Sequence, residues 1–234
     1  MYNILSNERI CEGIYLMTVE GAFQEARMGQ FFMLRAWQDA PLLSRPISIF
    51  NKEHNHIQFL YKIAGEGTRL LAALRPGDSI QLEGPLGNGF PDVMGRTALI
   101  GGGIGIAPLL YTAKQLDKPD IYLGFQQESY LTQAFEPYAN ELVVRIGGSV
   151  LDDLDLSRYE NVFVCGPLGM MKAAARMAEG LDTKVYVSLE KRMACGIGAC
   201  YVCSITNTDG NRKVCTDGPV FLAEEVKWDA ELSL

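Results

Sequence analysis

The chain has 234 residues, of which 48% are hydrophobic and 21% charged, an ordinary composition for a globular protein and a length that favours two cores over one. Its formal net charge of -7, without any block of basic residues, argues against a nucleic acid as partner. The longest uncharged run, residues 97–113, is shorter than the about 20 apolar residues of a membrane helix and is interrupted by glycines and Pro108, so we expect no membrane span.

The first ten residues, MYNILSNERI, lack the basic start and the apolar core of a signal peptide. Six cysteines would suit disulfides in a secreted protein, but without a signal peptide we expect a reducing, cytoplasmic location. The spacing of the cysteines therefore has to be interpreted in terms of metal or redox chemistry as well.

Residues 1–92 have the pattern of β structure. Short apolar runs at 14–19, 31–34, 47–50 and 57–61 are separated by glycine, asparagine and proline. Strands that are short and closely spaced predict a small antiparallel barrel. We expect this barrel to form the first domain.

Two segments of the predicted barrel suit an anion and a flat ring. Arg45-Pro46-Ile47-Ser48 begins one strand, and Gly65-Glu66-Gly67-Thr68 follows the strand that contains Tyr61. Arg45 and Thr68 are suited to a pyrophosphate, Ser48 to a hydrogen bond with a ring edge, and Tyr61 to stacking. Taken singly, the first segment is more typical of a strand start with a solvated arginine, and the second of a helix start with Thr68 as N-cap.

From about residue 97 the pattern changes to apolar strands that alternate with helical stretches, which predicts a parallel sheet with crossover helices. The segment 101–108, GGGIGIAP, follows the first of these strands and opens a predicted helix. Glycines in such a turn allow a pyrophosphate to approach the backbone at a helix N-terminus. Pro108 stands where the G-x-G-x-x-G pattern has its third glycine, and tight packing of the turn against the sheet is the alternative interpretation.

The charge pattern of the second domain bears on the choice between NAD and NADP. After the predicted strand 121–125 the chain continues Gln126-Gln127-Glu128-Ser129-Tyr130, and no lysine or arginine occurs between Lys118 and Arg145. A 2′-phosphate would lack a local cation there. The sequence therefore favours NAD.

Four cysteines near the C-terminus, Cys195, Cys200, Cys203 and Cys215, have the spacing C-x4-C-x2-C followed by a more distant cysteine. This spacing is typical of plant-type 2Fe-2S clusters, in which a tight loop wraps three thiolates around the cluster. Zinc is the main alternative, but structural zinc sites favour paired C-x2-4-C knuckles, and only Cys200 and Cys203 form one. The pattern favours an iron-sulfur cluster over zinc or disulfides.

Taken in order, these segments resemble those of a known family. RPIS, YKIAGEGT, GPLGNGF, GGGIGIAP, CGP and SLEKRMACGIGACYVC resemble the ferredoxin reductase superfamily, and most closely the electron-transfer subunits of type B, NAD-dependent dihydroorotate dehydrogenases. The resemblance covers essentially the whole chain, and the cysteine segment is its most specific part. It implies an FAD-binding β-barrel domain over residues 1–92, an NAD-binding α/β domain over 93–189 and a small 2Fe-2S lobe over 190–234.

Carried over residue by residue, the resemblance implies three groups of site residues. The FAD would lie against Arg45, Pro46, Ile47, Ser48, Leu60, Tyr61, Lys62, Gly67 and Thr68. The cluster ligands would be Cys195, Cys200, Cys203 and Cys215. The NAD would be bordered by Gly103, Gly105 and the turn Cys165-Gly166-Pro167, although Cys165 is equally typical of a buried cysteine at a strand end.

The resemblance also implies a function and a partner. A catalytic subunit that carries FMN would oxidise dihydroorotate to orotate in pyrimidine biosynthesis, and this chain would pass the electrons through the cluster and FAD to NAD, in a heterotetramer with two copies of each subunit. No catalytic acid or base for dihydroorotate is expected in this chain. Two other functions stay open at this point: a flavin and iron-sulfur reductase subunit of the ferredoxin or oxygenase type, and a non-catalytic scaffold whose cysteines hold zinc.

Overall fold

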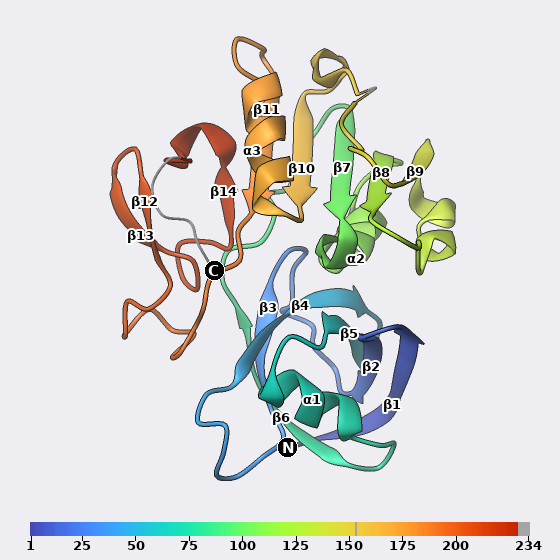
Figure 1. The fold of residues 1–234 in the computed structure, drawn as a ribbon, viewed down its shortest axis with the longest axis vertical. Coiled ribbons are helices and arrows are strands. Elements are labelled where there is room, and N and C mark those ends of the chain that lie inside the picture. The colour runs from blue at the N-terminus through green and yellow to red at the C-terminus, as the bar shows by residue number, and fades with distance from the viewer. Residues whose placement is uncertain (153, 229–234) are drawn as a thin grey trace.

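The computed structural model describes residues 1–152 and 154–228. A β-barrel forms one end of the molecule, an α/β sheet forms the other, and the C-terminal segment runs alongside both (Figure 1). In these two ranges no helix is long and apolar enough to cross a membrane.

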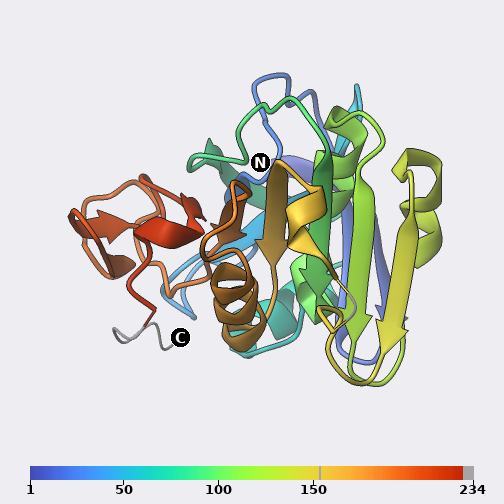
Figure 2. The same cartoon turned by 90° about the horizontal axis from the view of Figure 1, so that it is seen from above.

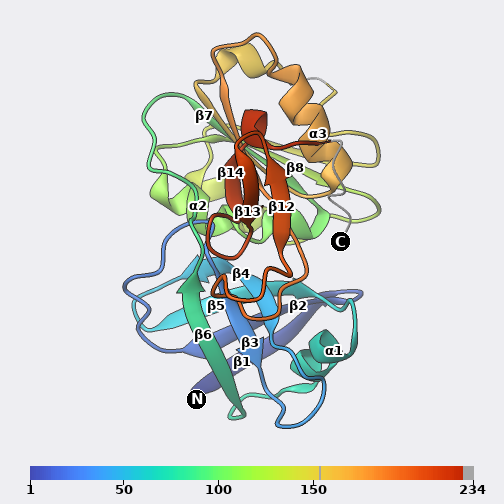
Figure 3. The ribbon, with the colours of Figure 1, turned by 90° about the vertical axis from the view of Figure 1, so that its left-hand side faces the viewer.

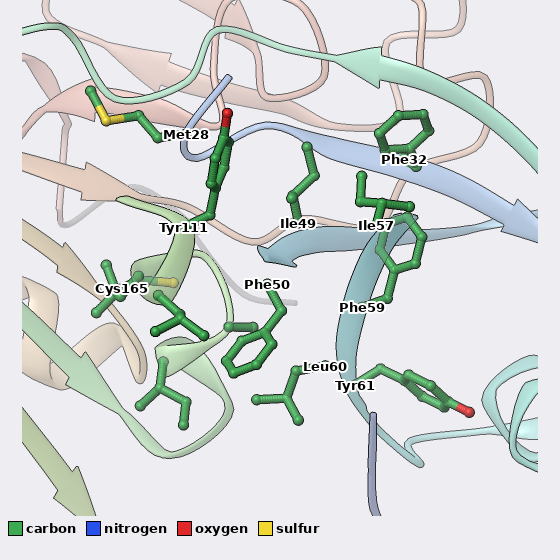
Figure 4. Packing of buried hydrophobic residues seen from close by; sticks show 14 of the residues in the cluster. Met28, Phe32, Ile49, Phe50, Ile57, Phe59, Leu60, Tyr61, Tyr111 and Cys165 are labelled. Carbon is green, nitrogen blue, oxygen red and sulfur yellow. The ribbon is translucent and has the colours of Figure 1, made fainter. Parts of the chain in front are cut away.

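Six strands close the predicted antiparallel barrel in the order β1-β2-β5-β4-β3-β6. In β5, Ile57, Phe59 and Tyr61 are buried at every second position, as expected for a strand with one face in a core. Leu60 lies on the opposite face of β5 and points with Phe50 away from Phe59 (Figure 4). The elements of this domain are β1 (Tyr2–Cys11), β2 (Ile14–Glu20), β3 (Phe31–Arg35), β4 (Arg45–Lys52), β5 (His56–Lys62), α1 (Glu66–Ala73) and β6 (Ser79–Leu86).

The second domain is a six-stranded sheet in the order β14-β11-β10-β7-β8-β9. The central strands β7 and β10 are buried at every residue, which is expected where helices and loops cover both faces of a parallel sheet. Its elements up to residue 188 are β7 (Thr97–Gly102), α2 (Leu109–Gln115), β8 (Asp120–Phe125), β9 (Leu142–Ile146), β10 (Asn161–Cys165), α3 (Leu168–Met177) and β11 (Lys184–Ser188).

The C-terminal segment contributes one strand to this sheet, which the sequence pattern did not predict. Strand β14 (Val220–Leu222) pairs with β11 in the antiparallel sense, while the hairpin β12 (Ser204–Asn207) and β13 (Gly210–Lys213) forms a separate two-stranded sheet. Figure 2 shows the hairpin at the end of the sheet that is farthest from β9. A strand of three residues is too short to show an apolar alternation in the sequence.

Two hydrophobic cores join the three parts of the chain. The first fills the barrel and continues onto one face of the sheet, where the rings of Phe90 and Phe163 stack with their centroids 4.6 Å apart. The second lies on the other face of the sheet and includes Met33 of the barrel together with Ile205 and Val214 of the C-terminal segment. Each part therefore buries apolar surface against the other two, which holds them in fixed positions.

A buried carboxylate ties together the ends of the sheet at which its parallel strands begin. Asp120 accepts hydrogen bonds from Arg96 Nη2 at 2.7 Å, Tyr159 Oη at 3.0 Å and Asn140 Nδ2 at 2.6 Å. Desolvation opposes the charge, but the hydrogen bonds outweigh it and lower the pKa of Asp120 below its ordinary value of 3.8. The ionised carboxylate therefore stabilises the fold above pH 3.8, and this contribution is lost as the pH falls through the lowered pKa.

Asp120→Asn keeps the size of the side chain but removes the charge and replaces one acceptor oxygen with an amide NH2 group, which would face either Asn140 or the Arg96 and Tyr159 donors. We expect the free energy of unfolding at pH 7 to fall by about 2–4 kcal/mol, because buried donors lose their charged acceptor. Urea denaturation of the two proteins measures this loss. Asp209→Asn makes the same change in the exposed Asp209–Arg212 pair and should cost less than about 1 kcal/mol; equal losses for the two variants would contradict the assignment.

Candidate functional site

The barrel opens where strands β4 and β5 diverge. Their ladder runs through Lys52–Ile57 and Asn51–Gln58 and ends at the pair Ile49–Phe59. Beyond this pair, residues 45–48 are paired only with β3 and residues 60–62 only with β2. The facing backbone edges of these two segments therefore have N–H and C=O groups available for a ligand.

Both barrel segments that the sequence singled out border this gap. Arg45, Pro46, Ile47 and Ser48 are all half-buried, whereas the next two residues of β4 are fully buried. Leu60 and Tyr61 are buried, and Lys62 is exposed at the end of β5. The two segments, which are more than ten residues apart in the sequence, thus face each other across the gap between the diverging strands.

The guanidinium of Arg45 lies against the start of helix α1. A β-carbon at Gly67 would come within 2.5 Å of the guanidinium carbon, so the glycine is what allows this approach. The guanidinium also donates a hydrogen bond to the carbonyl of Leu43 and lies 5.4 Å from the ring centroid of Trp37. A fixed cation beside the free N–H groups of a first helical turn suits a pyrophosphate.

Two of the predicted barrel residues, Thr68 and Tyr61, are placed differently from the expectation that their side chains face a ligand. Thr68 is the third residue of α1, not its N-cap, and its hydroxyl accepts the N–H groups of Ala64 and Gly65. The Tyr61 ring points into the barrel, where its hydroxyl donates to Asn7 Oδ1 at 2.9 Å. Thr68 therefore shapes the turn before α1, and at Tyr61 the backbone borders the gap while the ring belongs to the core.

The helix predicted after the glycine-rich turn is present, but it does not begin directly at the glycines. Strand β7 extends to Gly102, a short 3-10 helix covers Gly103–Ile106, and α2 begins only at Leu109, which is fully buried. Gly103 has a φ of +55°, in the left-handed region, and a β-carbon there would meet no atom within 4 Å. The open part of the turn is therefore Gly103 itself, and the start of α2 is covered by protein.

Gly105 and Cys165 lie side by side although 60 residues separate them. The two strands β7 and β10 are parallel neighbours with Gly101 opposite Cys165, so the turns that follow them meet at one edge of the sheet. A β-carbon at Gly105 would collide with the backbone of Cys165 and Gly166. The Cys165 thiol is buried, and desolvation, reinforced by the charge of Glu190, raises its pKa. The thiol is accordingly neutral at physiological pH.

A cleft of about 540 Å³ opens between the barrel, this edge of the sheet and the C-terminal segment. Its walls include Lys62 of the barrel, Gly103 and Pro167 of the two turns, Glu190, and Ile205 of the C-terminal hairpin. The segment after β8 that favours NAD also lines it, through Gln126, Gln127, Glu128 and Tyr130. A larger cavity of about 1070 Å³, behind α3, contains none of the predicted site residues.

The four C-terminal cysteines act on one another electrostatically. Cys195 interacts with Cys200, and Cys215 interacts with both Cys203 and Cys195. In residues 1–152 and 154–228 no three His, Cys, Asp or Glu side chains converge closely enough to hold a single ion. Four neighbouring thiols that do not surround one point suit a 2Fe-2S cluster, in which two protein ligands bind each iron, and a zinc ion would need four ligands around one point.

Backbone N–H groups surround the sulfur atoms, as the glycines of this loop permit. Gly198 donates its N–H to Cys215 Sγ at 3.2 Å. At Cys195, desolvation opposes ionisation, but hydrogen bonds from the N–H groups of Ile197, Ala199 and Cys200 outweigh it and lower the pKa to about 6. Thiolates are the form that binds metal, so the loop is suited to ligation before any metal is present.

The loop of residues 195–203, called the cysteine loop below, rests on the barrel near the gap between β4 and β5. A β-carbon at Gly196 would lie 3.0 Å from the Met33 side chain, so the loop and β3 are in close contact. In the β3–β4 ladder Met33 is the partner of Pro46, which belongs to the RPIS segment. Figure 3 shows the loop descending from the sheet to the barrel. The loop thus contacts β3, the neighbour of β4, and the other edge of β4 borders the gap.

Sequence reasoning missed Met33 and Trp37 as parts of the site. Met33 is buried in the middle of β3, and Trp37 follows that strand in a loop. Neither lies in a motif with a recognisable spacing. An apolar residue in a strand and an aromatic residue in a loop are both too common in sequences to be singled out without the fold.

Comparison with known proteins agrees with this arrangement. Residues 190–227 match the family model described as the iron-sulfur cluster binding domain of dihydroorotate dehydrogenase B. The chain is 43% identical to the electron transfer subunit of dihydroorotate dehydrogenase B (NAD(+)) from Clostridium acetobutylicum, over 95% of both chains. It is 39% identical to the protein of the same name from Clostridium perfringens, over 96% of both.

Solved structures give the same result at the level of the whole fold. An NADH-dependent reduced ferredoxin-NADP oxidoreductase structure superposes with a TM-score of 0.88 and 28% identity, covering 98% of this chain and 90% of the other. Phthalate dioxygenase reductase superposes with a TM-score of 0.60 at 19% identity, covering 92% and 76%, and shares the fold. From its similarity to the two clostridial proteins over nearly its whole length, the chain belongs to the family of electron transfer subunits of dihydroorotate dehydrogenase B.

Proposed function

We propose that this protein is the electron-transfer subunit of an NAD-dependent dihydroorotate dehydrogenase and connects a catalytic partner subunit to NAD through a 2Fe-2S cluster and FAD. The observation that carries this proposal is the contact of the cysteine loop with Met33, the ladder partner of Pro46. This contact brings the proposed cluster and flavin sites together on one face of the barrel. FAD exchanges a hydride with NAD and single electrons with the cluster, so it converts one kind of transfer into the other.

In this proposal the barrel, residues 1–92, binds FAD. The guanidinium of Arg45 and the first turn of α1 at Gly67 would hold the pyrophosphate, and Thr68 would maintain the turn between β5 and α1. The diverging backbones of β4 and β5 would bind the ring system in place of the ladder that they lack. The residues assigned to FAD are Arg45, Pro46, Ile47, Ser48, Leu60, Tyr61, Lys62, Gly67 and Thr68.

The other two cofactor sites follow the remaining domains. NAD would occupy the cleft at the edge of the sheet formed by residues 93–189, bordered by Gly103, Gly105 and Cys165. Gly105 and Cys165 would act through the backbone packing that shapes the cleft. The cluster would be held in residues 190–234 by Cys195, Cys200, Cys203 and Cys215; residues 229–234 of that range lie outside the described residues.

The partner would dock at the cysteine loop. Ile197, Tyr201 and Val202 are 66%, 67% and 50% exposed, and Cys200 between them is exposed too. Exposed apolar side chains around a redox centre suit a protein surface that approaches the centre closely. We propose that this partner carries FMN, that two copies of each subunit form a heterotetramer, and that the complex works in the cytoplasm.

The visible spectrum tests the presence of both cofactors. The protein purified without oxygen should contain flavin, iron and sulfide, and NADH should bleach its visible spectrum.

Removal of one cluster ligand tests the proposed path of the electrons. Cys200→Ser should lose the cluster spectrum and at least about 90% of the coupled dihydroorotate-to-NAD activity, because metal sites depend on their complete ligand set, while NADH still reduces FAD. Cys11→Ser, which changes a cysteine outside the four, should keep the cluster spectrum and is the control for that spectrum. Coupled turnover in a Cys200→Ser protein without a cluster would place the cluster off the electron path, and a colourless zinc protein would refute the proposal itself.

Arg45→Ala tests the flavin site. Loss of a charge-assisted hydrogen bond of about 1.5–3 kcal/mol should weaken FAD binding roughly 10- to 100-fold. Titration of the flavin-free protein with FAD gives the dissociation constant directly. Arg158→Ala removes an exposed arginine that precedes β10 in the sheet domain and should leave FAD affinity unchanged. Equal affinity in wild type and Arg45→Ala would refute this site.

Nucleotide preference follows from the charge of the cleft. Glu128 lines the cleft beside Gln126 and Gln127, and no lysine or arginine lies between Lys118 and Arg145. The 2′-phosphate of NADPH would meet a carboxylate there instead of a cation. We expect NADH to reduce the bound FAD with a kcat/KM at least about tenfold higher than NADPH. Equal values in stopped-flow experiments would show that a cation from elsewhere in the fold serves this position.

A further inference from the structure

Glu190 stands at the junction of the three parts of the chain. It follows β11 by two residues and lines the cleft together with Lys62 of the barrel, Gly103 of the glycine turn and Ile205 of the C-terminal hairpin. Its charge acts on the Cys165 thiol at the end of the neighbouring strand β10. The carboxyl group is therefore held at the cleft wall by the end of a central strand of the sheet.

The Glu190 carboxylate has no partner. Throughout residues 1–152 and 154–228, no group donates a hydrogen bond to it or forms an ion pair with it. Water reaches the side chain from the cleft, but the surrounding protein removes part of its hydration and raises its pKa above the ordinary value of 4.5. A ligand that displaces water from the cleft would raise the pKa further. Such a carboxyl group keeps its proton to a higher pH than an ordinary glutamate and can exchange it with solvent.

Other titratable groups of the cleft are less suited to this task. Burial, the largest cause in each case, raises the pKa of Cys11, that of Cys165, and that of Tyr130 to about 12, so all three hold their protons at neutral pH. Glu128 is hydrogen-bonded to Cys11. The titratable groups that face Glu190 across or beneath the cleft are Cys11, Glu12, Lys62, Glu128, Tyr130 and Cys165.

The proposed function requires a proton at the flavin site, and Lys62 of that proposed site lines the same cleft as Glu190. Electrons that cross an iron-sulfur cluster carry no proton, whereas the hydride that leaves for NAD contains one proton and two electrons. One proton must therefore enter the flavin site for each pair of electrons that arrives from the cluster, and one must leave when electrons flow the other way. In contrast, a flavin that receives hydride from NADH obtains the proton and the electrons together.

We propose that the Glu190 carboxyl supplies this proton to the flavin site when the electrons come through the cluster, and that water in the cleft protonates it again. The inference rests on the proposed function, because it needs both cofactors. It makes Glu190 necessary for electron flow between cluster and FAD and dispensable for hydride transfer between FAD and NADH. This asymmetry separates a proton-carrying role from a structural one.

The test compares two ways of reducing FAD in the complete complex with the catalytic subunit. In Glu190→Gln, reduction of FAD by dihydroorotate, through the cluster, should be about a hundredfold slower, the usual scale of a lost general acid. Reduction by saturating NADH in a single turnover should keep its wild-type limiting rate, because the hydride brings its own proton; since Glu190 lines the proposed nucleotide cleft, the NADH concentration at half-maximal rate is free to change. In wild type the rate of FAD reduction through the cluster (the cluster-fed rate) should fall as the pH rises through the raised Glu190 pKa. In Glu190→Gln this fall should be absent.

Two variants and one direct observation control the experiment. Glu190→Asp, which keeps a carboxyl, should recover part of the cluster-fed rate, and Glu12→Gln, on the same cleft, should leave the ratio of the two rates as in wild type. Infrared difference spectra of wild type against Glu190→Gln should show a protonated carboxyl band that disappears as the pH rises through the raised Glu190 pKa. Equal slowing of both reactions, slowing of neither, or absence of that band overturns the inference; a wild-type complex whose FAD is not reduced by NADH refutes the proposed function instead.

Discussion

Strands β4 and β5 leave part of their backbone without a ladder, and the rest of the structure is arranged around this gap. N–H and C=O groups at a strand edge need hydrogen-bond partners, and here the barrel itself does not provide them past the Ile49–Phe59 pair. The guanidinium of Arg45 and the first turn of α1 stand at one side of the gap. A flavin with a pyrophosphate and a polar ring edge satisfies both requirements at once, which is why the two sequence segments that border the gap belong to a single proposed site.

The sheet and the C-terminal segment bring the other two sites to the same gap. Parallel strands end at one edge, so the turns after β7 and β10 meet there and form the cleft that faces the barrel. The cysteine loop contacts β3 through Gly196, with no element between them. Electron transfer depends on short separations between cofactors, and packing of all three parts into two shared cores keeps these separations constant. Glu190 lies where the three parts converge, and in our proposal it supplies the proton that accompanies the electrons.

Several features could be predicted because a local pattern determines them. The spacing of Cys195, Cys200 and Cys203 restricts one short loop, and strand and helix periodicity indicated a barrel followed by a parallel sheet. Prediction was poorer where distant residues decide the outcome. The ring of Tyr61 could face either side of β5, and its hydrogen bond with Asn7 on β1 places it in the core. The glycine pattern also did not indicate that Gly105 packs on the backbone of Cys165 and Gly166, 60 residues later in the chain.

By itself, the sequence determined which chemistry this protein supports: four thiols at iron-sulfur spacing, a barrel segment with a fixed cation, a glycine turn after a strand and a stretch without cations that favours NAD. These are properties of neighbouring residues, and the chain carries them in any conformation. Only the tertiary structure decided how the parts are connected. The divergence of β4 from β5, the contact of Gly196 with Met33, the addition of β14 to the sheet and the unpartnered carboxyl of Glu190 all depend on residues far apart in the chain. Their positions result from apolar burial and backbone pairing across the whole fold, which no local pattern records.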